Sequence, residues 1–381
     1  MFDDYVLLNA KLAIDYAKEK LGSFFEGKDL DCEEIGDGNI NYVYRVKSDD
    51  KSVILKQGTE TLRSSGRALD KARTNIEYEA LKNIYNLSKM SPEIYFFDEI
   101  MNVIAMEDLS DYKNLRYCLI NNEIYENLAE EIIKYFEKNY FSTTSIYMDA
   151  KQRKEEIKKF TNVDMCDITE DLVMTEPYYN YKNRNIVYKG NEDFVENTLC
   201  KNEKVLYNAA IMREKFMNFP QSLIHGDLHT GSIFVNESGI KVIDSEFAFY
   251  GPIGYDLGCV IGNLYISYLY NMLKNNDEMV NYLGEVVEKI VDELPQRLYK
   301  ALLNNQTIPM YTAKFKKKYV KNIMKDGLKY AGMEMTRRSV GDSKVVELTG
   351  LENMKEKTKF QRKLVKVGVE LLTKKYAFAV E

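Results

Sequence analysis

Three acidic residues in one short segment have the spacing of a phosphate-handling site. The segment, residues 223–258, reads LIHGDLHTGSIFVNESGIKVIDSEFAFYGPIGYDLG. Asp227 follows an apolar run on a glycine-containing turn, and Asp244 ends the next expected strand, so we expect both carboxylates to converge from the ends of one hairpin. Phosphoryl transfer uses such a pair: one carboxylate accepts the proton of the attacking hydroxyl, and another holds Mg²⁺ against the nucleotide phosphates. Asp227 is thus the predicted catalytic base and Asp244 the predicted Mg²⁺ ligand, and Glu246 lies two residues further on.

The same segment holds both histidines of the chain, His225 and His229. A single histidine beside such a loop is more often a hydrogen-bonded support than a reacting group. We therefore predict a supporting role for His225 and assign no role to His229 or Thr230.

The string HGDLHTGS resembles the catalytic loop of the aminoglycoside phosphotransferase and choline kinase superfamily, which is itself similar to the HRDxxxxN loop of protein kinases. Within that superfamily the chain resembles the methylthioribose kinases, on MEDLS at 106–110, CDITEDLVMTEPYY at 166–179 and MTRRSVG at 335–341. The motif DSE at 244–246 resembles the metal-binding acid motif that follows the catalytic loop, which implies that Glu246 binds Mg²⁺ together with Asp244. The resemblance implies ATP and Mg²⁺ as cofactors and phosphorylation of the anomeric 1-hydroxyl of 5-methylthioribose in methionine salvage. It also implies a homodimer.

A glycine-rich stretch, IGDGNINYVYRV at residues 35–46, is typical of a hairpin with a tight turn. The candidate nucleotide contacts there are Gly36, Asp37, Gly38, Asn39 and Asn41, because glycine lets backbone N–H groups approach phosphates closely. Any hairpin could use such a turn.

The residues after this turn favour the nucleotide-binding interpretation. Lys56 on the next expected strand and Glu77 on the following helix have the order of the ion pair that orients ATP phosphates in kinases. Glu79 is a competing partner for Lys56.

The motif MEDLS is the expected connector between two lobes. By resemblance to kinases, Met106 occupies the gatekeeper position, and the Glu107 carbonyl and the Leu109 amide contact adenine, with Asp108 between them. The alternative is an edge strand that ends with Asp108 as a helix cap.

The resemblance also places Arg337 and Arg338 in the sugar site, together with Asp227, on a helix beginning near Met333. Guanidinium groups suit vicinal hydroxyls and a transferred phosphoryl group alike. The tyrosine-rich stretch 176–185 is a candidate wall for the methylthio group, although its tyrosines could equally pack the lobe.

Two residues depart from the expected motifs. Ser232 stands where most of the superfamily has a metal-binding asparagine, which leaves the number of metal ions open. Ser245, a predicted nucleotide contact within the DSE motif, stands where the family usually has proline.

Other functions stay open on these residues. They are a related kinase acting on 5-deoxyribose, another sugar, an aminoglycoside, choline or homoserine, and a kinase-like nucleotide-binding module without turnover. Cationic acceptors need an acidic pocket, so an arginine pair favours a neutral polyol.

Composition excludes several classes of protein. The net charge of −6 has the wrong sign for nucleic-acid binding, and five cysteines without a CxxC pair suggest neither a disulfide framework nor zinc. The acidic N-terminus is unlike a signal peptide, so we expect a cytoplasmic protein. The most apolar run, residues 257–270, is too short to span a membrane and is predicted to be a buried helix.

The elements that must position these residues divide the chain in two. Apolar periodicity predicts a helix at 5–20, strands at 35–46, 52–57, 94–99 and 102–108, and a helix at 69–86. The rest is mainly helical, with strand-like pieces at 232–236 and 240–244. The predicted class is therefore α+β, a bilobal protein-kinase-like fold with a small β-rich N-terminal lobe, residues 1–109, and a larger, mainly α-helical C-terminal lobe, residues 110–381. The segment 1–109 is the predicted nucleotide-binding lobe, and 110–381 the catalytic and substrate-binding lobe.

Overall fold

A computed structural model describes residues 2–35, 41–61, 69–303 and 308–380. It divides into two compact units. Unit 1 comprises Met1–Tyr112 and Lys241–Phe247, and unit 2 comprises Lys113–Ile240 and Ala248–Glu381. The sequence prediction put one boundary after residue 109 and did not anticipate that residues 241–247 return to unit 1.

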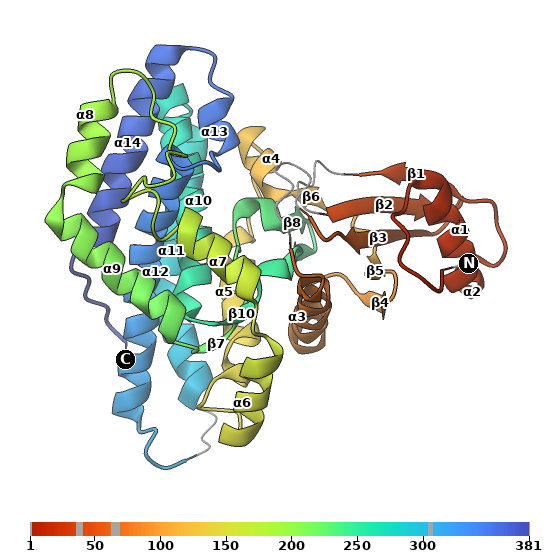
Figure 1. Ribbon diagram of the computed structural model, residues 1–381. Helices are drawn as coiled ribbons and strands as arrows, with labels where there is room; N and C mark the ends of the chain where they lie inside the picture. Colours follow the sequence, from red (N-terminus) through yellow and green to blue (C-terminus); the bar gives the residue numbers. More distant parts are fainter. Residues whose placement is uncertain (1, 36–40, 62–68, 304–307, 381) are drawn as a thin grey trace. The chain divides into compact units, whose positions relative to one another are not determined.

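Unit 1 is built on a five-stranded antiparallel sheet in the order β1-β2-β3-β5-β4 (Figure 1). Its strands are β1 (Asp31–Glu34), β2 (Asn41–Lys47), β3 (Ser52–Gly58), β4 (Ile94–Asp98) and β5 (Val103–Glu107). Its helices are α1 (Ala10–Lys20), α2 (Gly22–Phe25) and α3 (Ala72–Ser88), and the returning segment forms the 3₁₀ turn η4 (Ser245–Phe247), which packs on α3.

The first helix begins later than its apolar pattern predicts. Asn9 caps it, because its side chain accepts a hydrogen bond from the backbone N–H of Leu12. Tyr16 of α1 then packs with Tyr44 and Leu55 of the sheet in a core from which water is excluded. The strands and the helix α3 lie within a few residues of their predicted positions.

Unit 2 is mainly helical (Figure 1). Its helices are α4 (Leu115–Ile120), α5 (Leu128–Asn139), α6 (Ala150–Lys159), α7 (Val163–Leu172), α8 (Glu192–Val195), α9 (Glu203–Asn218), α10 (Ile253–Lys274), α11 (Asp277–Leu303), α12 (Ala313–Val340), α13 (Val346–Thr349) and α14 (Met354–Thr373). The short strands are β6 (Lys113–Asn114), β7 (Ser222–Ile224), β8 (Ile233–Asn236) and β10 (Phe249–Gly251), and β9 (Gly239–Val242) begins in unit 2 and ends in unit 1.

The strand pairing corrects one expectation. The strand before Asp227, β7, pairs with β10, whereas β8 pairs with β6. Asp227 therefore does not end a strand of the hairpin that leads to Asp244; it lies in the loop between β7 and the 3₁₀ turn η3 (Thr230–Ser232). Three-residue strands carry too little pattern to show which partner they choose.

The core of unit 2 is formed by α12, which packs against both α10 and α14 (Figure 1). The predicted buried helix at 257–270 is part of α10, and most of its residues are inaccessible to solvent. Among the described residues, no helix combines the length and apolar character needed to cross a bilayer. The helix that carries Arg337 and Arg338 begins at Ala313, about twenty residues before its predicted start, so the arginine pair lies in its last turn.

Candidate functional site

The predicted strand lysine and helix glutamate meet in unit 1. Lys56 Nζ on β3 donates to Glu77 Oε1 on α3 at 2.6 Å and to Asp244 Oδ1 at 2.5 Å. Lys56 and Glu77 are buried, whereas 47% of the Asp244 side chain is exposed. The structure thus pairs Lys56 with Glu77, not Glu79, and adds Asp244 to the pair.

This cluster has more acid than base. Burial lowers the pKa of Lys56, but the charges of Asp244 and Glu77 raise it by more than burial lowers it. The lysine is therefore a cation. Burial and the charge of Asp244 raise the pKa of Glu77, and Lys56 lowers it, which leaves a net pKa of about 7. Burial and Asp244 likewise raise the pKa of Glu246. A further cation near Asp244 would relieve this repulsion.

Glu246 is held by a buried arginine that the sequence prediction missed. Arg73 Nη1 donates to Glu246 Oε2 and to Asn41 Oδ1, both at 2.7 Å, and Asn41 Nδ2 donates to the same carboxylate at 3.1 Å. Arg73 precedes Glu77 by one turn of α3, and this i,i+4 spacing on the face that carries Glu77 was the available signal. Asn41, a predicted nucleotide contact, therefore orients Glu246.

Asp244 has a backbone conformation that L-residues adopt rarely. Its φ of 69° is left-handed, which aspartate tolerates better than most residues and which is common where structure serves a ligand. The next residue, Ser245, is fully buried, and its hydroxyl has no hydrogen-bond partner among the described residues.

The donor set of this cluster fits Mg²⁺ bound with a nucleotide. Mg²⁺ in phosphotransferases takes one or two carboxylates and completes its shell with phosphate oxygens and water. Within the described residues no three acidic, histidine or cysteine side chains form a metal cage. Asp244 is exposed enough to bind directly, whereas Glu246 already accepts from Arg73 and Asn41. Asp244 is therefore the better ligand of the two.

The other predicted nucleotide contacts in unit 1 lie around the end of β5. Glu107 Oε2 accepts from Lys241 Nζ at 2.6 Å, and the Leu109 carbonyl accepts from the N–H of Tyr112. The Asp108 carboxylate receives two bonds from Arg45, at 2.9 and 3.2 Å, so its side chain is not the helix cap of the alternative interpretation. Gly36, Asp37, Gly38 and Asn39 lie outside the described residues.

The loop that carries Asp227 is fixed by a buried carboxylate of unit 2. Asp256, in the first turn of α10, accepts from the N–H groups of His225 and Gly226 at 2.7 and 3.0 Å and from the Tyr140 hydroxyl at 2.7 Å. Gly226 has a φ of 85°, a conformation that favours glycine. The His225 ring accepts from the N–H of Asp227. His225 therefore supports the loop.

Asp227 meets the predicted arginine pair. Arg337 Nη2 donates to Asp227 Oδ1 at 2.9 Å, and Arg338 Nη2 lies 3.8 Å from the same oxygen. Burial raises the pKa of Asp227, but Arg337 and Arg338 lower it more, so the net pKa lies below the usual range. Asp227 is thus an ionised carboxylate aimed at two guanidinium groups.

Glu334 anchors both arginines and was missed by the sequence prediction. It accepts from Arg337 Nε at 2.6 Å and from Arg338 Nε at 2.9 Å, and it also accepts from Asn263 on α10. Its place three and four residues before the pair was the readable signal. Asp256 lies within the family-like string GYDLG, but nothing in the sequence connects it to the loop.

Two polar residues of η3 and its flank complete the loop. Ser232, which stands in place of asparagine, donates to the Asp227 carbonyl at 3.2 Å and contacts His229 Nδ1 at 3.4 Å. Burial, Arg338 and Arg116 lower the pKa of His229 well below its usual value, so the ring is neutral. Ser232 thus serves the loop.

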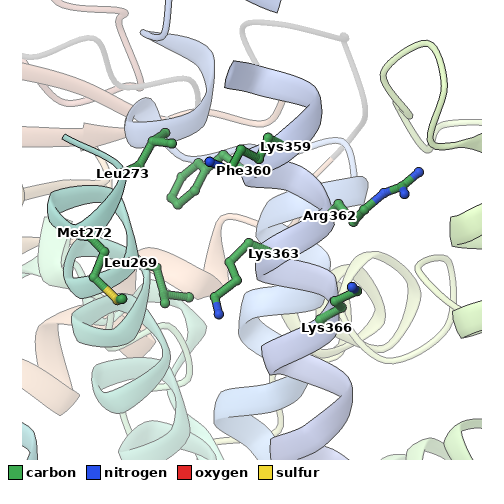
Figure 2. Close-up of a pocket in the computed structure, with 8 residues that line it drawn as sticks. All are labelled: Leu269, Met272, Leu273, Lys359, Phe360, Arg362, Lys363 and Lys366. Atoms are coloured by element: carbon green, nitrogen blue, oxygen red, sulfur yellow. The ribbon is translucent and has the colours of Figure 1, made fainter. Parts of the chain in front are cut away.

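A surface pocket of unit 2 lies elsewhere on its helices (Figure 2). Apolar side chains of α10, and four basic side chains and one phenylalanine of α14, line it: Leu269, Met272, Leu273, Lys359, Phe360, Arg362, Lys363 and Lys366. None of the predicted site residues lines this pocket.

Comparison with known proteins decides the family. Residues 190–272 match the model of the phosphotransferase enzyme family. A methylthioribose kinase of Geobacillus sp. (strain WCH70) is 34% identical over 93% of this chain and 88% of that protein. A methylthioribose kinase of Escherichia coli O45:K1 (strain S88) is also 34% identical, over 89% of this chain and 86% of that protein. The chain belongs to the methylthioribose kinase family.

The fold of this methylthioribose kinase family member agrees with a solved structure. Choline kinase from Cryptosporidium parvum Iowa II covers 95% of this chain with a TM-score of 0.51 at 12% identity, and 98% of that chain is covered. The predicted protein-kinase-like α+β fold, with a β-rich N-terminal and a helical C-terminal part, is confirmed. Membership of the family also confirms the predicted enzyme class, a kinase.

Proposed function

We propose that the protein is an ATP-dependent kinase that phosphorylates the anomeric 1-hydroxyl of 5-methylthioribose, giving 5-methylthioribose 1-phosphate in methionine salvage. One observation carries the proposal: in a chain of this family, an ionised Asp227 is held 2.9 Å from Arg337. A carboxylate so placed accepts the hydroxyl proton, while the guanidinium groups bind oxygens that gain negative charge.

The residues of unit 1 have the complementary role. Lys56, fixed by Glu77, would bind the nucleotide phosphates, and Asp244 with Glu246 would hold Mg²⁺. Bound Mg²⁺ offsets negative charge on the phosphates. We assign the remaining nucleotide contacts to Gly36, Asp37, Gly38, Asn39, Asn41, Ser245 and the backbone of Glu107, Asp108 and Leu109.

The charges of unit 2 favour a neutral acceptor. Arg337 and Arg338 beside Asp227 repel a cationic substrate such as choline or an aminoglycoside. The non-enzymatic alternative, a nucleotide-binding module, does not need Asp227 at all, whereas here an elaborate set of buried bonds positions it.

The tyrosines of the stretch 176–185 differ in their exposure to solvent. Tyr179 and Tyr181 stack on each other at 5.5 Å and are 68% and 47% exposed, whereas Tyr178 is buried. Tyr178 is therefore the member of this stretch that we assign to the methylthio pocket.

The test is ATP consumption with methylthioribose, 5-deoxyribose, ribose, choline and homoserine. An apolar pocket gains about 0.8 kcal/mol per buried CH₂-sized group, so 5-deoxyribose should be used several-fold less efficiently than methylthioribose. Ribose should be poorer still, because its 5-hydroxyl is buried without a partner at about 1–3 kcal/mol. Equal catalytic efficiency with ribose and methylthioribose would refute the methylthio pocket. A preference for choline would refute the proposal that the substrate is a neutral sugar.

The oligomeric state and the cellular compartment of the enzyme are proposed from the resemblance to its family. We propose a cytoplasmic homodimer, and five unpaired cysteines in the structure agree with a reducing compartment. Sedimentation of the purified protein at the mass of a single 44.4 kDa chain would contradict the dimer.

A further inference from the structure

A third arginine lies against the loop that carries Asp227. Arg116 is the second residue of α4, and its guanidinium packs on Gly231: a Cβ at Gly231 would come within 3.0 Å of Arg116 Cζ and 2.8 Å of His229 Cε1. Asn114 fixes this approach, because its side chain accepts from the N–H of Arg116 and donates to the Gly231 carbonyl at 2.6 Å. The hydrogen bonds of Asn114 at the start of α4 therefore hold Arg116 beside Gly231.

Arg116 has buried donors without acceptors. Its Nε and Nη2 are inaccessible to solvent and have no hydrogen-bond partner among the described residues, and the same holds for Arg338 Nη2 and Thr230 Oγ1. Unsatisfied buried groups of this kind are rare in folded proteins and call for a physical explanation. Here they gather around a single loop.

The two unsatisfied arginines repel each other. Burial lowers the pKa of Arg116, and the charge of Arg338 lowers it further, while Glu347, Asp227 and Glu334 raise it, so the net pKa lies below the usual value. Arg337 pairs with Glu334 through Nε and with Asp227 through Nη2. Arg338 pairs with Glu334 through Nε, but its Nη2 has no hydrogen-bond partner among the described residues. The N–H donors without acceptors among the described residues therefore belong to Arg116 and Arg338.

We propose that Arg116 and Arg338 form an oxyanion subsite that binds the phosphoryl group of the sugar 1-phosphate product, an inference that rests on the proposed function. Neutral hydroxyls would satisfy the free N–H groups but leave the repulsion between the cations, whereas a phosphate dianion removes both costs. In the transfer, the bond between the sugar O1 and phosphorus forms, the bond from phosphorus to ADP breaks, and Asp227 takes the hydroxyl proton.

Phosphate binding in the absence of turnover tests the subsite. Inorganic phosphate, ribose 1-phosphate and ATP are titrated calorimetrically into the wild type, Arg116→Gln and the control Arg213→Gln, which alters a partly exposed arginine of α9. Arg116→Gln should weaken phosphate and ribose 1-phosphate binding at least tenfold, about 1.4 kcal/mol, and leave ATP within twofold. Arg213→Gln should change none of the three.

Three outcomes would overturn the subsite. They are no phosphate binding by the wild type at 10 mM, unchanged phosphate affinity in Arg116→Gln, and a larger loss for ATP than for phosphate. A rise in the KM for methylthioribose equal to the loss of phosphate affinity would also overturn it, because Arg116 would then bind sugar hydroxyls. Arg116→Lys, which keeps the charge, should lose less than Arg116→Gln and serves if the latter does not fold.

These measurements separate the subsite from the proposed function. Phosphate titration needs no catalysis, so it reports on Arg116 even if methylthioribose is not a substrate. Conversely, the wild type could phosphorylate methylthioribose while Arg116→Gln binds phosphate with full affinity. That result would support the proposed function and refute the subsite.

Discussion

The Asp227 carboxylate accepts a hydrogen bond from Arg337, and the Asp227 backbone N–H donates to the ring of His225. One contact therefore keeps the carboxylate ionised, and the other fixes the position of the residue. Asp227→Asn keeps the shape and the support but cannot accept a proton. We expect the turnover number to fall by two or more orders of magnitude with little change in ATP affinity. Steady-state kinetics and ATP titration check this, and a variant with more than about a tenth of wild-type turnover would remove Asp227 from the chemistry.

Glu334, which holds Arg337 and Arg338, gives the stability of the protein a measurable pH dependence. Burial raises its pKa, but Arg337 and Arg338 lower it more, to about 2. Because the folded-state pKa lies below the ordinary value of 4.5, the stabilisation is complete above pH 4.5 and is lost as the pH falls towards 2. It amounts to about 3 kcal/mol.

Urea unfolding of the wild type, Glu334→Gln and the exposed control Glu285→Gln between pH 7 and pH 2.5 measures this contribution. Glu334→Gln should be less stable at pH 7 and should lose less stability on acidification than the other two proteins. If the free energy of unfolding falls with pH in parallel for all three proteins, the ion pairs of Glu334 with the arginines do not contribute to stability.

At this scale the sequence reveals charge but not burial. Lys56, Glu77, Asp227 and the arginine pair could be predicted because their types and order match a chemical task. Arg116 could not, because its role depends on a contact with Gly231, more than a hundred residues away in the chain.

Among the elements, the packing of α10 on α12 decides where Glu334 and the arginines lie. A Cβ at Gly258 of α10 would come within 2.4 Å of Tyr330 Cβ and 2.7 Å of the Ala331 backbone nitrogen, so the helices can approach only because this residue is glycine. Gly258→Ala must separate them.

We expect Gly258→Ala to lower the free energy of unfolding by about 1–3 kcal/mol and to weaken sugar binding. The matched control is Gly284→Ala on α11, where the nearest atom would be Tyr268 Cε2 at 3.7 Å, an ordinary contact. That variant should gain about 0.5–1 kcal/mol from helix propensity alone. Equal effects of the two substitutions would mean that the close approach is unimportant.

Long elements were easier to predict than their connections. The apolar run of α10 and the strands of unit 1 carry enough periodicity to be recognised. The start of α1 shifted because Asn9 caps it, and the pairing of β7 with β10 joins segments too short to show a pattern.

For the whole molecule, each unit should respond to its own ligand. We expect Mg²⁺ with ATP, and methylthioribose separately, to raise the melting temperature of the wild type, because each binds only the folded state. Lys56→Met should abolish the response to ATP and keep that to the sugar, and Arg337→Met should do the reverse. Differential scanning fluorimetry measures both, and loss of both responses in either variant would contradict this division of labour.

The return of residues 241–247 to unit 1 bears on the order of events during synthesis. When the first 112 residues leave the ribosome, Arg73 and Lys56 have emerged but Glu246 and Asp244 have not been translated. Lys56 already has Glu77, but burying Arg73 without Glu246 is costly. The nascent N-terminal segment therefore cannot complete its interior until residues 241–247 have emerged. A chaperone or a protease that acts on the nascent chain would meet an open N-terminal sheet while residues 113–247, about a third of the chain, are being made.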